Sequence, residues 1–405
     1  MKQESEKKPQ ARRREFLKQG SALGGLAAIA GVPGLARAQS SGPVKLGLML
    51  PATGTFAQLG SAIENGLKLA IDEKGGKLGG REVEYFKVDD ESDPAKATDN
   101  VNRLVTRDKV DVLIGTVHSG VALAMVKVAK DTNTILLIPN AGADAATGPL
   151  CAPNVFRTSF ANSQTGYPMG KVMAERGIKT AVTISWKYAA GEESVAGFKD
   201  AFTRGGGKVL KELWLPFPNV EFQPLLTEIA ALRPDAVYTF FAGAGAVKFL
   251  KDYQAAGLKG RIPLYGSGFL TDGVLEAVGD AAEGVETTLH YADSLDTPKD
   301  KTFRLAYVKA YKTQPDVYAV QGYDTGLLLA QAFDKTKGGV DKPALIRAME
   351  TATVDSPRGA WHFSKAHNPV QDMYLRKVVG KQNRVVNIAI KQLDYPPADR
   401  CKMSS

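Results

Sequence analysis

The chain has 405 residues, of which 44% are hydrophobic and 23% are charged, and its formal net charge is +9. The first 38 positions hold eight Lys and Arg residues and three Asp and Glu residues, so +5 of that charge lies there and +4 lies in the rest. This mild charge is spread along the chain without a basic stripe, which argues against a nucleic-acid partner. The roughly 365 residues after position 38 are sufficient for two domains.

The N-terminal stretch has the parts of an export signal in the required order. RREFLK at 13–18 fits the twin-arginine pattern, a weakly apolar run covers 20–36, and ARA at 36–38 is a small-residue cleavage site. The apolar run is too short and too rich in glycine to span a bilayer, which needs about 20 apolar residues. A disordered basic tail is the alternative. We predict that 1–38 is a signal peptide for the twin-arginine export machinery, cleaved after Ala38, which places the mature chain in the periplasm.

From Val44 onward, short apolar runs alternate with amphipathic stretches. Strands are expected near 44–50, 82–90, 110–115, 134–139, 180–185, 207–215, 235–241 and 262–266. Helices are expected around 63–71, from Asp93, from Ser119, and near 163–176, 190–204, 221–232, 244–256, 299–312, 318–336 and 342–350. The tail from Trp361 is strand-like. Since the β-α alternation restarts after 156–158, we predict an α/β fold of two Rossmann-like lobes with parallel central sheets, and a cleft at the carboxyl ends of their strands.

Motifs of catalysis and cofactor binding are incomplete. The stretch 54–61 lacks the spacing and the lysine of a phosphate loop, and 243–248 has only two glycines of a dinucleotide fingerprint. His362 and His367 do not match a zinc helix and are expected to be solvated loop histidines. The acidic triplet at 89–91 is more typical of a charged strand end than of a metal site. We therefore predict no catalytic residue, no metal and no cofactor.

Two neighbouring strand ends carry residues that suit an anion. GTVHSG at 115–120 opens a helix, whose unpaired N–H groups and dipole favour negative charge, and Ser119 adds a hydroxyl and can cap the helix. PNAGA at 139–143 follows the next strand, and its small residues let a ligand approach the backbone. Each loop alone can equally be a cap and a turn, but the pair of loops favours a carboxylate-binding site.

The chain resembles the Leu/Ile/Val-binding-protein family, the type I solute-binding proteins of ABC importers, from about Val44 to the C-terminus. The order and spacing of several segments carry this resemblance: PATGTFAQLG, DDESDPAKA, VDVLIGTVHSG, IPNAGA, CAPNVFRTS, KYAAGEE, RPDAVYTF and YAVQGYDT. The resemblance implies two lobes joined by a three-stranded hinge, with a ligand held in the cleft between the lobes.

In that family the chain crosses between the lobes three times, and the matching points lie near Thr158, 290–291 and Arg358. The implied lobe boundaries are 44–158 and 292–357 for the first lobe, and 159–291 and 358–400 for the second. Cys151 and Cys401 allow one disulfide or two separate thiols in an oxidising compartment. Because Cys151 precedes the first crossing and Cys401 lies near the chain end, we predict that they are bonded.

The resemblance also transfers cleft positions: the carboxylate-binding serine to Ser119, the donor segment to Asn140, Ala141 and Gly142, and the cleft tyrosine to Tyr188. The acidic residue that holds the ligand ammonium in amino-acid binders falls on Gly268. The remaining candidates for the cleft are His118, Phe56, Trp186, Phe241, Phe269, His290 and Tyr323. A ring hydroxyl could be received by His290, Gln321 or Asp324, and Asp324 could instead replace the missing acidic residue.

These features predict a periplasmic solute-binding protein that captures a small organic carboxylate, and an aromatic acid in particular, because Trp186, Phe241 and Phe269 offer an uncharged wall. Its expected partners are this ligand and the permease of an ABC importer, and it is expected to act as a monomer. Three alternatives stay open: a branched-chain amino acid-binding protein of the same family, a ligand sensor that presents its closed form to a receptor, and an exported enzyme.

Overall fold

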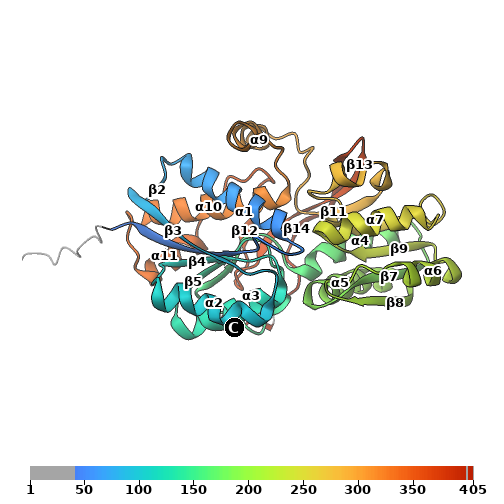
Figure 1. Cartoon of the computed structure of the whole chain (residues 1–405), viewed down its shortest axis with the longest axis horizontal. Helices are drawn as coiled ribbons and strands as arrows, with labels where there is room; N and C mark the ends of the chain where they lie inside the picture. Colours follow the sequence, from blue (N-terminus) through green and yellow to red (C-terminus); the bar gives the residue numbers. More distant parts are fainter. Residues whose placement is uncertain (1–41, 398–399, 405) are drawn as a thin grey trace, which may run out of the picture. The chain divides into compact units, whose positions relative to one another are not determined.

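The computed structural model describes residues 42–397 and 400–404 (Figure 1). The signal peptide expected at 1–38 lies outside the described residues. None of the helices in these two ranges is long and apolar enough to cross a membrane. The helices, in chain order, are α1 (Ala57–Asp72), α2 (Pro94–Asn102), α3 (Ser119–Thr132), α4 (Asn162–Glu175), α5 (Ala189–Arg204), α6 (Gln223–Leu232), α7 (Gly243–Ala255), α8 (Leu275–Val278), α9 (Pro298–Tyr311), α10 (Val317–Lys335) and α11 (Lys342–Glu350).

The first sheet joins six strands in the order β2-β3-β1-β4-β5-β6. These strands are β1 (Val44–Leu50), β2 (Lys77–Leu78), β3 (Arg81–Asp89), β4 (Val112–Gly115), β5 (Ile135–Ile138) and β6 (Val155–Arg157). From β3 to β6 the neighbours pair in parallel, while β2 runs antiparallel to β3. The helices α1, α2 and α3 form crossovers between the strands from β1 to β5, and they therefore cover the faces of the sheet.

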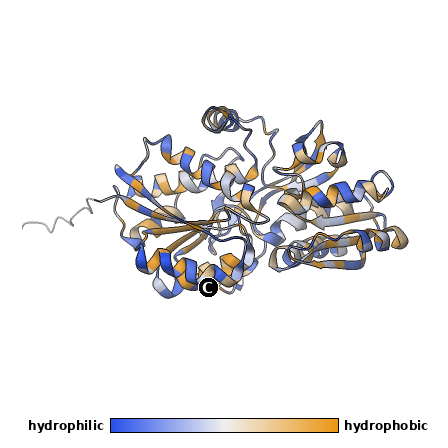
Figure 2. Ribbon diagram, in the orientation of Figure 1, coloured by the Kyte–Doolittle hydropathy of each residue, from blue (hydrophilic) through white to orange (hydrophobic). Residues whose placement is uncertain are grey.

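Alternate residues of this sheet are buried on its two faces, as the two-residue period of a strand requires. Leu46 and Leu48 of β1 belong to the hydrophobic cluster that includes α1 and α10, whereas Met49 belongs to the cluster of α2 and α3. Figure 2 shows these strands as mostly hydrophobic ribbons between helices with hydrophilic outer faces. The backbones of α1 and α10 approach closely, because a Cβ atom on Gly66 would lie 1.9 Å from the carbonyl oxygen of Ala319.

The second sheet has the order β12-β13-β11-β10-β9-β7-β8, with β14 paired to β13. Its strands are β7 (Thr180–Lys187), β8 (Lys208–Pro216), β9 (Ala236–Phe240), β10 (Leu264–Ser267), β11 (Glu286–Leu289), β12 (His362–Phe363), β13 (Pro369–Val379) and β14 (Gln382–Leu393). The strands from β7 to β11 are parallel, but β13 is antiparallel to β11, β12 and β14. The expected parallel sheet is thus mixed, because β13 joins its edge in the opposite direction. Gly380 and Lys381, both with positive φ, form the two-residue hairpin turn between β13 and β14.

Two buried arginines satisfy carbonyl groups near the expected chain crossings. Arg358 donates to the carbonyl oxygen of Thr158 at 2.6 Å and pairs with the carboxylate of Asp324 at 2.7 Å. Arg376 donates to the carbonyl oxygen of Tyr291 at 2.8 Å. These guanidinium groups join segments that are 200 and 85 residues apart in the sequence.

Two further expectations concern the C-terminal part of the chain. Cys151 and Cys401 are joined in a disulfide, with their Cα atoms 5.7 Å apart. The expectation that His367 is solvated is wrong: it is 3% exposed, its ring stacks on Phe156 at 3.9 Å, and its Nδ1 lies 3.0 Å from the carbonyl oxygen of Val155. The turn that carries His367 folds back onto β6, so the imidazole becomes part of the packing there.

Candidate ligand-binding site

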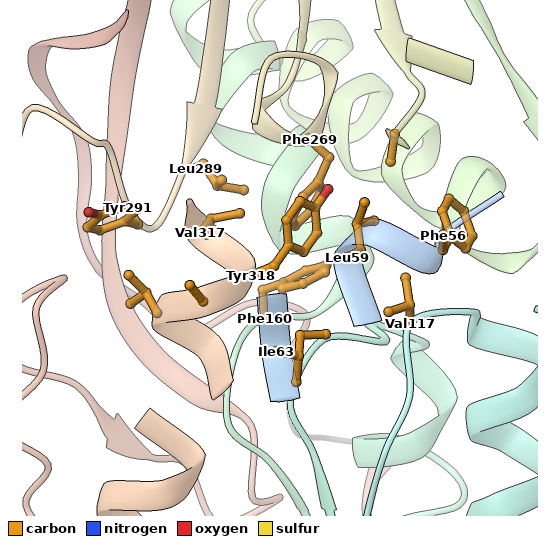
Figure 3. Packing of buried hydrophobic residues seen from close by; sticks show 14 of the residues in the cluster. Phe56, Leu59, Ile63, Val117, Phe160, Phe269, Leu289, Tyr291, Val317 and Tyr318 are labelled. Atoms are coloured by element: carbon orange, nitrogen blue, oxygen red, sulfur yellow. The ribbon is translucent and has the colours of Figure 1, made fainter. Parts of the chain in front are cut away.

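A small cavity lies where the carboxyl ends of strands from both sheets meet, and Figure 3 shows several of the hydrophobic side chains that line it. Its walls come from the loops after β4, β5, β7, β9 and β10, and from the beginnings of α1, α4 and α10. The lining residues are Phe56, Leu59, Val117, Asn140, Gly142, Phe160, Asn162, Tyr188, Ala190, Phe240, Ala242, Phe269 and Tyr318. The enclosed space is about 20 Å³, which suffices for one water molecule. A larger ligand therefore enters only when the facing walls move apart.

The loop after β4 turns into α3 at the polar side of the cavity. The expectation that Ser119 caps this helix is wrong: the cap is His118, whose Nδ1 accepts the N–H of Gly120 at 3.1 Å. Ser119 is the first helical residue instead, and its Oγ accepts a hydrogen bond from Nδ2 of Asn162 at 3.1 Å. Ser119 is not itself among the lining residues, but its hydroxyl contacts Asn162, which is, and it lies in the first turn of α3. A hydroxyl and a helix N-terminus together suit an anion.

Burial shifts the pKa values of two ionisable side chains near this loop. Asp90, expected in a charged strand end, is fully buried, and its carboxylate accepts hydrogen bonds from the Thr116 hydroxyl and the N–H of Ser92. Burial raises the pKa of Asp90 to about 6, and burial lowers the pKa of His118 to about 4. His118 is therefore neutral at neutral pH and offers no cation to a ligand. In the described part of the chain, no group of three His, Cys, Asp or Glu side chains could hold a metal ion.

The loop after β5 offers fewer donors than its sequence suggests. The N–H of Ala141 donates to a backbone carbonyl of the loop after β4 at 2.9 Å. Nδ2 of Asn140 donates to Oε1 of Gln321 at 2.7 Å, and Nε2 of Gln321 lies 3.2 Å from Nε2 of His290. Gly142 lines the cavity, and its N–H donates to no other group within residues 42–397 and 400–404. That N–H is the donor of this segment that remains for a ligand.

Aromatic rings form much of the remaining wall. Phe269 packs against Phe160 with ring centroids 4.6 Å apart and against Tyr318 at 5.8 Å, and Figure 3 shows these three rings together. Tyr188 stacks on His118 at 4.9 Å. The hydroxyl of Tyr318 is buried and has no hydrogen-bond partner among the described residues. These rings offer flat apolar surface, with one unused hydroxyl, to a ligand.

Seven of the predicted site residues are not among the lining residues: His118, Ser119, Ala141, Trp186, Phe241, His290 and Tyr323. Trp186 and Phe241 are fully buried, pack against each other at 5.0 Å and support the wall from behind. Tyr323 donates its hydroxyl to Oε2 of Glu73 at 2.6 Å, outside the cavity. His290 is buried in the hydrogen-bonded chain with Gln321, where burial lowers its pKa well below the usual value.

No Asp or Glu side chain is among the described residues that line the cavity. Gly268 does not face it either, since a Cβ atom there would lie 2.5 Å from Cβ of Leu289 and from Nη2 of Arg376. Asp324 is fully buried, and its Oδ2 is 2.7 Å from Nε of Arg358. Neither position therefore offers a carboxylate to a ligand ammonium.

Several lining residues carried a weak signal or none in the sequence. The lining residues that sequence analysis did not predict are Leu59, Val117, Phe160, Asn162, Ala190, Phe240, Ala242 and Tyr318. Phe160 and Asn162 follow β6 directly, so the rule that ligands meet strand ends could have found them. Tyr318 begins a helix far along the chain, and no local pattern points to it.

A larger groove of about 800 Å³ lies elsewhere, between α1 and the segments 271–276, 313–316 and 380–383. Charged residues of its lining pair with one another or with a neighbour: Lys381 lies 3.1 Å from Glu276, and Asp272 pairs with Arg376 at 2.7 Å. The smaller cavity lies at the facing strand ends of the two sheets, where ligands bind open α/β sheets, so we assign the site to it.

Two sheets whose strands alternate with helices, and a cavity at their facing strand ends, define a type I periplasmic binding protein. The chain belongs to the periplasmic binding protein family, whose model matches residues 43–383. This confirms the family and the fold class predicted from the sequence. Membership implies a periplasmic location and a small-molecule ligand.

Individual relatives support the same assignment. A solute-binding protein of an ABC transporter from R. palustris, solved in complex with benzoate, is 52% identical; the match covers 89% of this chain and all of that one, with a TM-score of 0.87. One from Rhodopseudomonas palustris BisB5, solved with 3,4-dihydroxybenzoic acid, is 32% identical over 86% of this chain and 98% of that one, with a TM-score of 0.81. The Leu/Ile/Val-binding protein homolog 6 of Brucella melitensis is 30% identical over 83% of this chain and 87% of its own length.

Proposed function

We propose that the protein captures a small aromatic carboxylate in this cavity and delivers it to the permease of an ABC importer. The observation that carries the proposal is the composition of the lining. It contains aromatic rings and hydrogen-bond donors that suit an anion, and it contains no carboxylate side chain. The relatives solved with benzoate and with 3,4-dihydroxybenzoic acid support the same ligand class.

In the proposed complex, the ligand carboxylate accepts hydrogen bonds from the N–H of Gly142 and the hydroxyl of Ser119. The ring lies against Phe160, Phe269 and Tyr188, where aromatic rings pack in edge-to-face or offset arrangements. A ligand ammonium would be buried without a partner, which is costly. This cost argues against a branched-chain amino acid, although relatives with Leu/Ile/Val-binding names keep that alternative in view.

The proposal also covers the export of the protein, its oligomeric state and the movement of its lobes. Residues 1–38 serve as a twin-arginine signal peptide cleaved after Ala38, and the mature chain works as a monomer and not as an enzyme. Its lobes, 44–158 with 292–357 and 159–291 with 358–400, rotate about the crossings near Thr158, 290–291 and Arg358. Opening admits the ligand, and the permease binds the closed form.

A thermal-shift panel tests the ligand class. Benzoate, 4-hydroxybenzoate and 3,4-dihydroxybenzoate are expected to raise the melting temperature of the purified mature protein, because a ligand that binds only the folded state stabilises it. Leucine, isoleucine and valine are expected to leave it unchanged. A shift with leucine and none with any aromatic acid would contradict the proposal and favour the amino-acid alternative. Deletion of the cognate permease gene, with loss of benzoate uptake, separates transport from sensing.

A further inference from the structure

The side-chain amide of Asn162 connects the hydroxyl of Ser119 to the carboxylate of Glu193. Its Nδ2 atom donates to Oγ of Ser119 at 3.1 Å and to Oε2 of Glu193 at 2.7 Å. Glu193 lies in α5, which follows β7 of the second sheet, whereas Ser119 lies in α3 beside the first sheet. The three side chains therefore form a hydrogen-bonded relay across the place where the two sheets face each other.

The direction of every bond in this relay is fixed by chemistry. An amide carries both of its donor hydrogens on one nitrogen, and here both are used, one for each partner. Oε2 of Glu193 acts as an acceptor, so the amide nitrogen of Asn162, and not its oxygen, must face Glu193 and Ser119. Ser119 then receives a hydrogen bond on its oxygen, and its own hydroxyl proton remains able to donate. That proton is left for a ligand.

Glu193 is itself held in place by its surroundings. Its Oε2 also accepts the backbone N–H of Asp144 at 3.0 Å. The charged groups that face it are the carboxylate of Asp144, which lies in the loop after β5, and the guanidinium of Arg157 in β6. Burial and the Asp144 carboxylate raise the pKa of Glu193 to about 7. Oε2 is the acceptor in both bonds, so a proton on the other oxygen, Oε1, leaves the relay unchanged.

We infer that Glu193 is a positioning residue for the ligand: through Asn162 it keeps the Ser119 hydroxyl oriented as a donor toward the carboxylate. This inference rests on the proposed function, because the carboxylate it serves is the one proposed for the Ser119 corner. The same arrangement explains how the half-buried Glu193 can lie near an anion site, since its Oε2 already accepts hydrogen bonds from two N–H donors.

Without the acceptor of Glu193, the Asn162 amide can rotate and present its oxygen to Ser119. The hydroxyl would then donate to Asn162 and be lost to the ligand. A purely structural role, in which Glu193 only ties α5 to the loop after β5, makes a different prediction. In that case loss of Glu193 weakens binding by the same factor whether or not residue 119 has a hydroxyl.

A double-mutant cycle separates the two roles, with benzoate as the probe and calorimetry as the measurement. Glu193→Met, which keeps the length of the side chain but removes the acceptor, is expected to lower benzoate affinity about tenfold. Glu193→Gln keeps an acceptor oxygen and is expected to restore most of that loss. In a Ser119→Ala background, Glu193→Met is expected to lower affinity by less than about twofold, because coupled residues are not additive. Glu192→Gln, on the exposed face of the same helix, is the matched control.

Several results would overturn the inference. Equal benzoate affinity in wild type and Glu193→Met removes the role of Glu193, and a full tenfold loss in the Ser119→Ala background reduces it to a structural one. A Glu193→Gln variant as weak as Glu193→Met contradicts the acceptor role. Circular dichroism of each variant checks that it folds, and Glu193→Ala, which also removes the acceptor, takes the place of Glu193→Met in the cycle if Glu193→Met does not fold. Absence of benzoate binding by the wild type would instead refute the proposed function, which distinguishes the two failures.

Discussion

Arg358 and Asp324 form an ion pair in which Nε and Oδ2 are 2.7 Å apart and both side chains are almost fully buried. The sequence left open whether Asp324 faces the cleft and holds a ligand ammonium. In the structure its Oδ2 also accepts the hydroxyl of Ser356 at 2.9 Å, and Asp324 is not part of the cavity lining. Asp324 therefore serves the packing around Arg358, and the cavity keeps its uncharged character.

Removing one partner of this pair should destabilise the protein strongly. Asp324→Asn leaves the Arg358 charge buried without its counterion, which costs about 3–5 kcal/mol in comparable pairs. The loss is expected as a lower midpoint of urea unfolding. The control is Asp252→Asn, which breaks the partly exposed Lys248–Asp252 pair and should cost less than about 1 kcal/mol. Equal effects of the two substitutions would show that burial of the Arg358 pair does not matter.

Ser119→Ala is expected to weaken benzoate binding without unfolding the protein. One charge-assisted hydrogen bond is lost, worth about 1.5–3 kcal/mol, which corresponds to roughly tenfold to a hundredfold in affinity. Calorimetric titration measures the change. Ser61→Ala removes an exposed hydroxyl of α1 and serves as the control. Wild-type affinity in the Ser119 variant would remove this residue from the site.

Tyr318→Phe is expected to make the unliganded protein more stable. Its hydroxyl is buried without a hydrogen-bond partner among the described residues, and such a group costs about 1–3 kcal/mol. The melting temperature should therefore rise. Tyr253→Phe is a matched control, because the Tyr253 hydroxyl donates to the carbonyl oxygen of Ile262 at 3.0 Å, and its removal should lower the melting temperature. A fall with Tyr318→Phe as well would mean that this hydroxyl has a stabilising partner.

The bond between Cys151 and Cys401 predicts that the unreduced, denatured protein has no titratable thiol. Because the bond closes a long loop, spanning 250 residues, the reduced protein or Cys401→Ser is expected to lose about 2–5 kcal/mol of stability. Thiol titration with and without reductant measures the first point, and urea unfolding measures the second. Two reactive thiols before reduction would disprove the bond.

The regular elements could be predicted because their signals are local. The buried runs at 44–50 and 180–185 became β1 and β7, and Asp93 caps α2 as expected, with its side chain accepting the N–H of Ala95. Strand periodicity and cap chemistry act within a few residues, so they can be read from one stretch of sequence. The antiparallel direction of β13 was missed because the pairing of distant strands has no local signal.

The candidate site could be predicted only in part, for the same reason. Ser119 and Gly142 both follow strand ends and were predicted for that reason, and Gly142 lines the cavity. The cap of α3 was assigned to Ser119 and belongs to His118. The roles of Asn162 and Glu193 depend on contacts between residues 31 and 43 positions apart. Trp186 was expected in the cleft because it is aromatic and lies beside Tyr188, but alternation along β7 turns its side chain into the core behind the wall.

The most direct test of the account is a calorimetric titration of the purified mature protein with benzoate and, separately, with leucine. We expect saturable binding of benzoate at one site per chain, with a negative heat-capacity change from burial of the ring, and no heat of binding with leucine. Saturable binding of leucine without any binding of benzoate would contradict it, because a leucine ammonium finds no carboxylate in the lining described here.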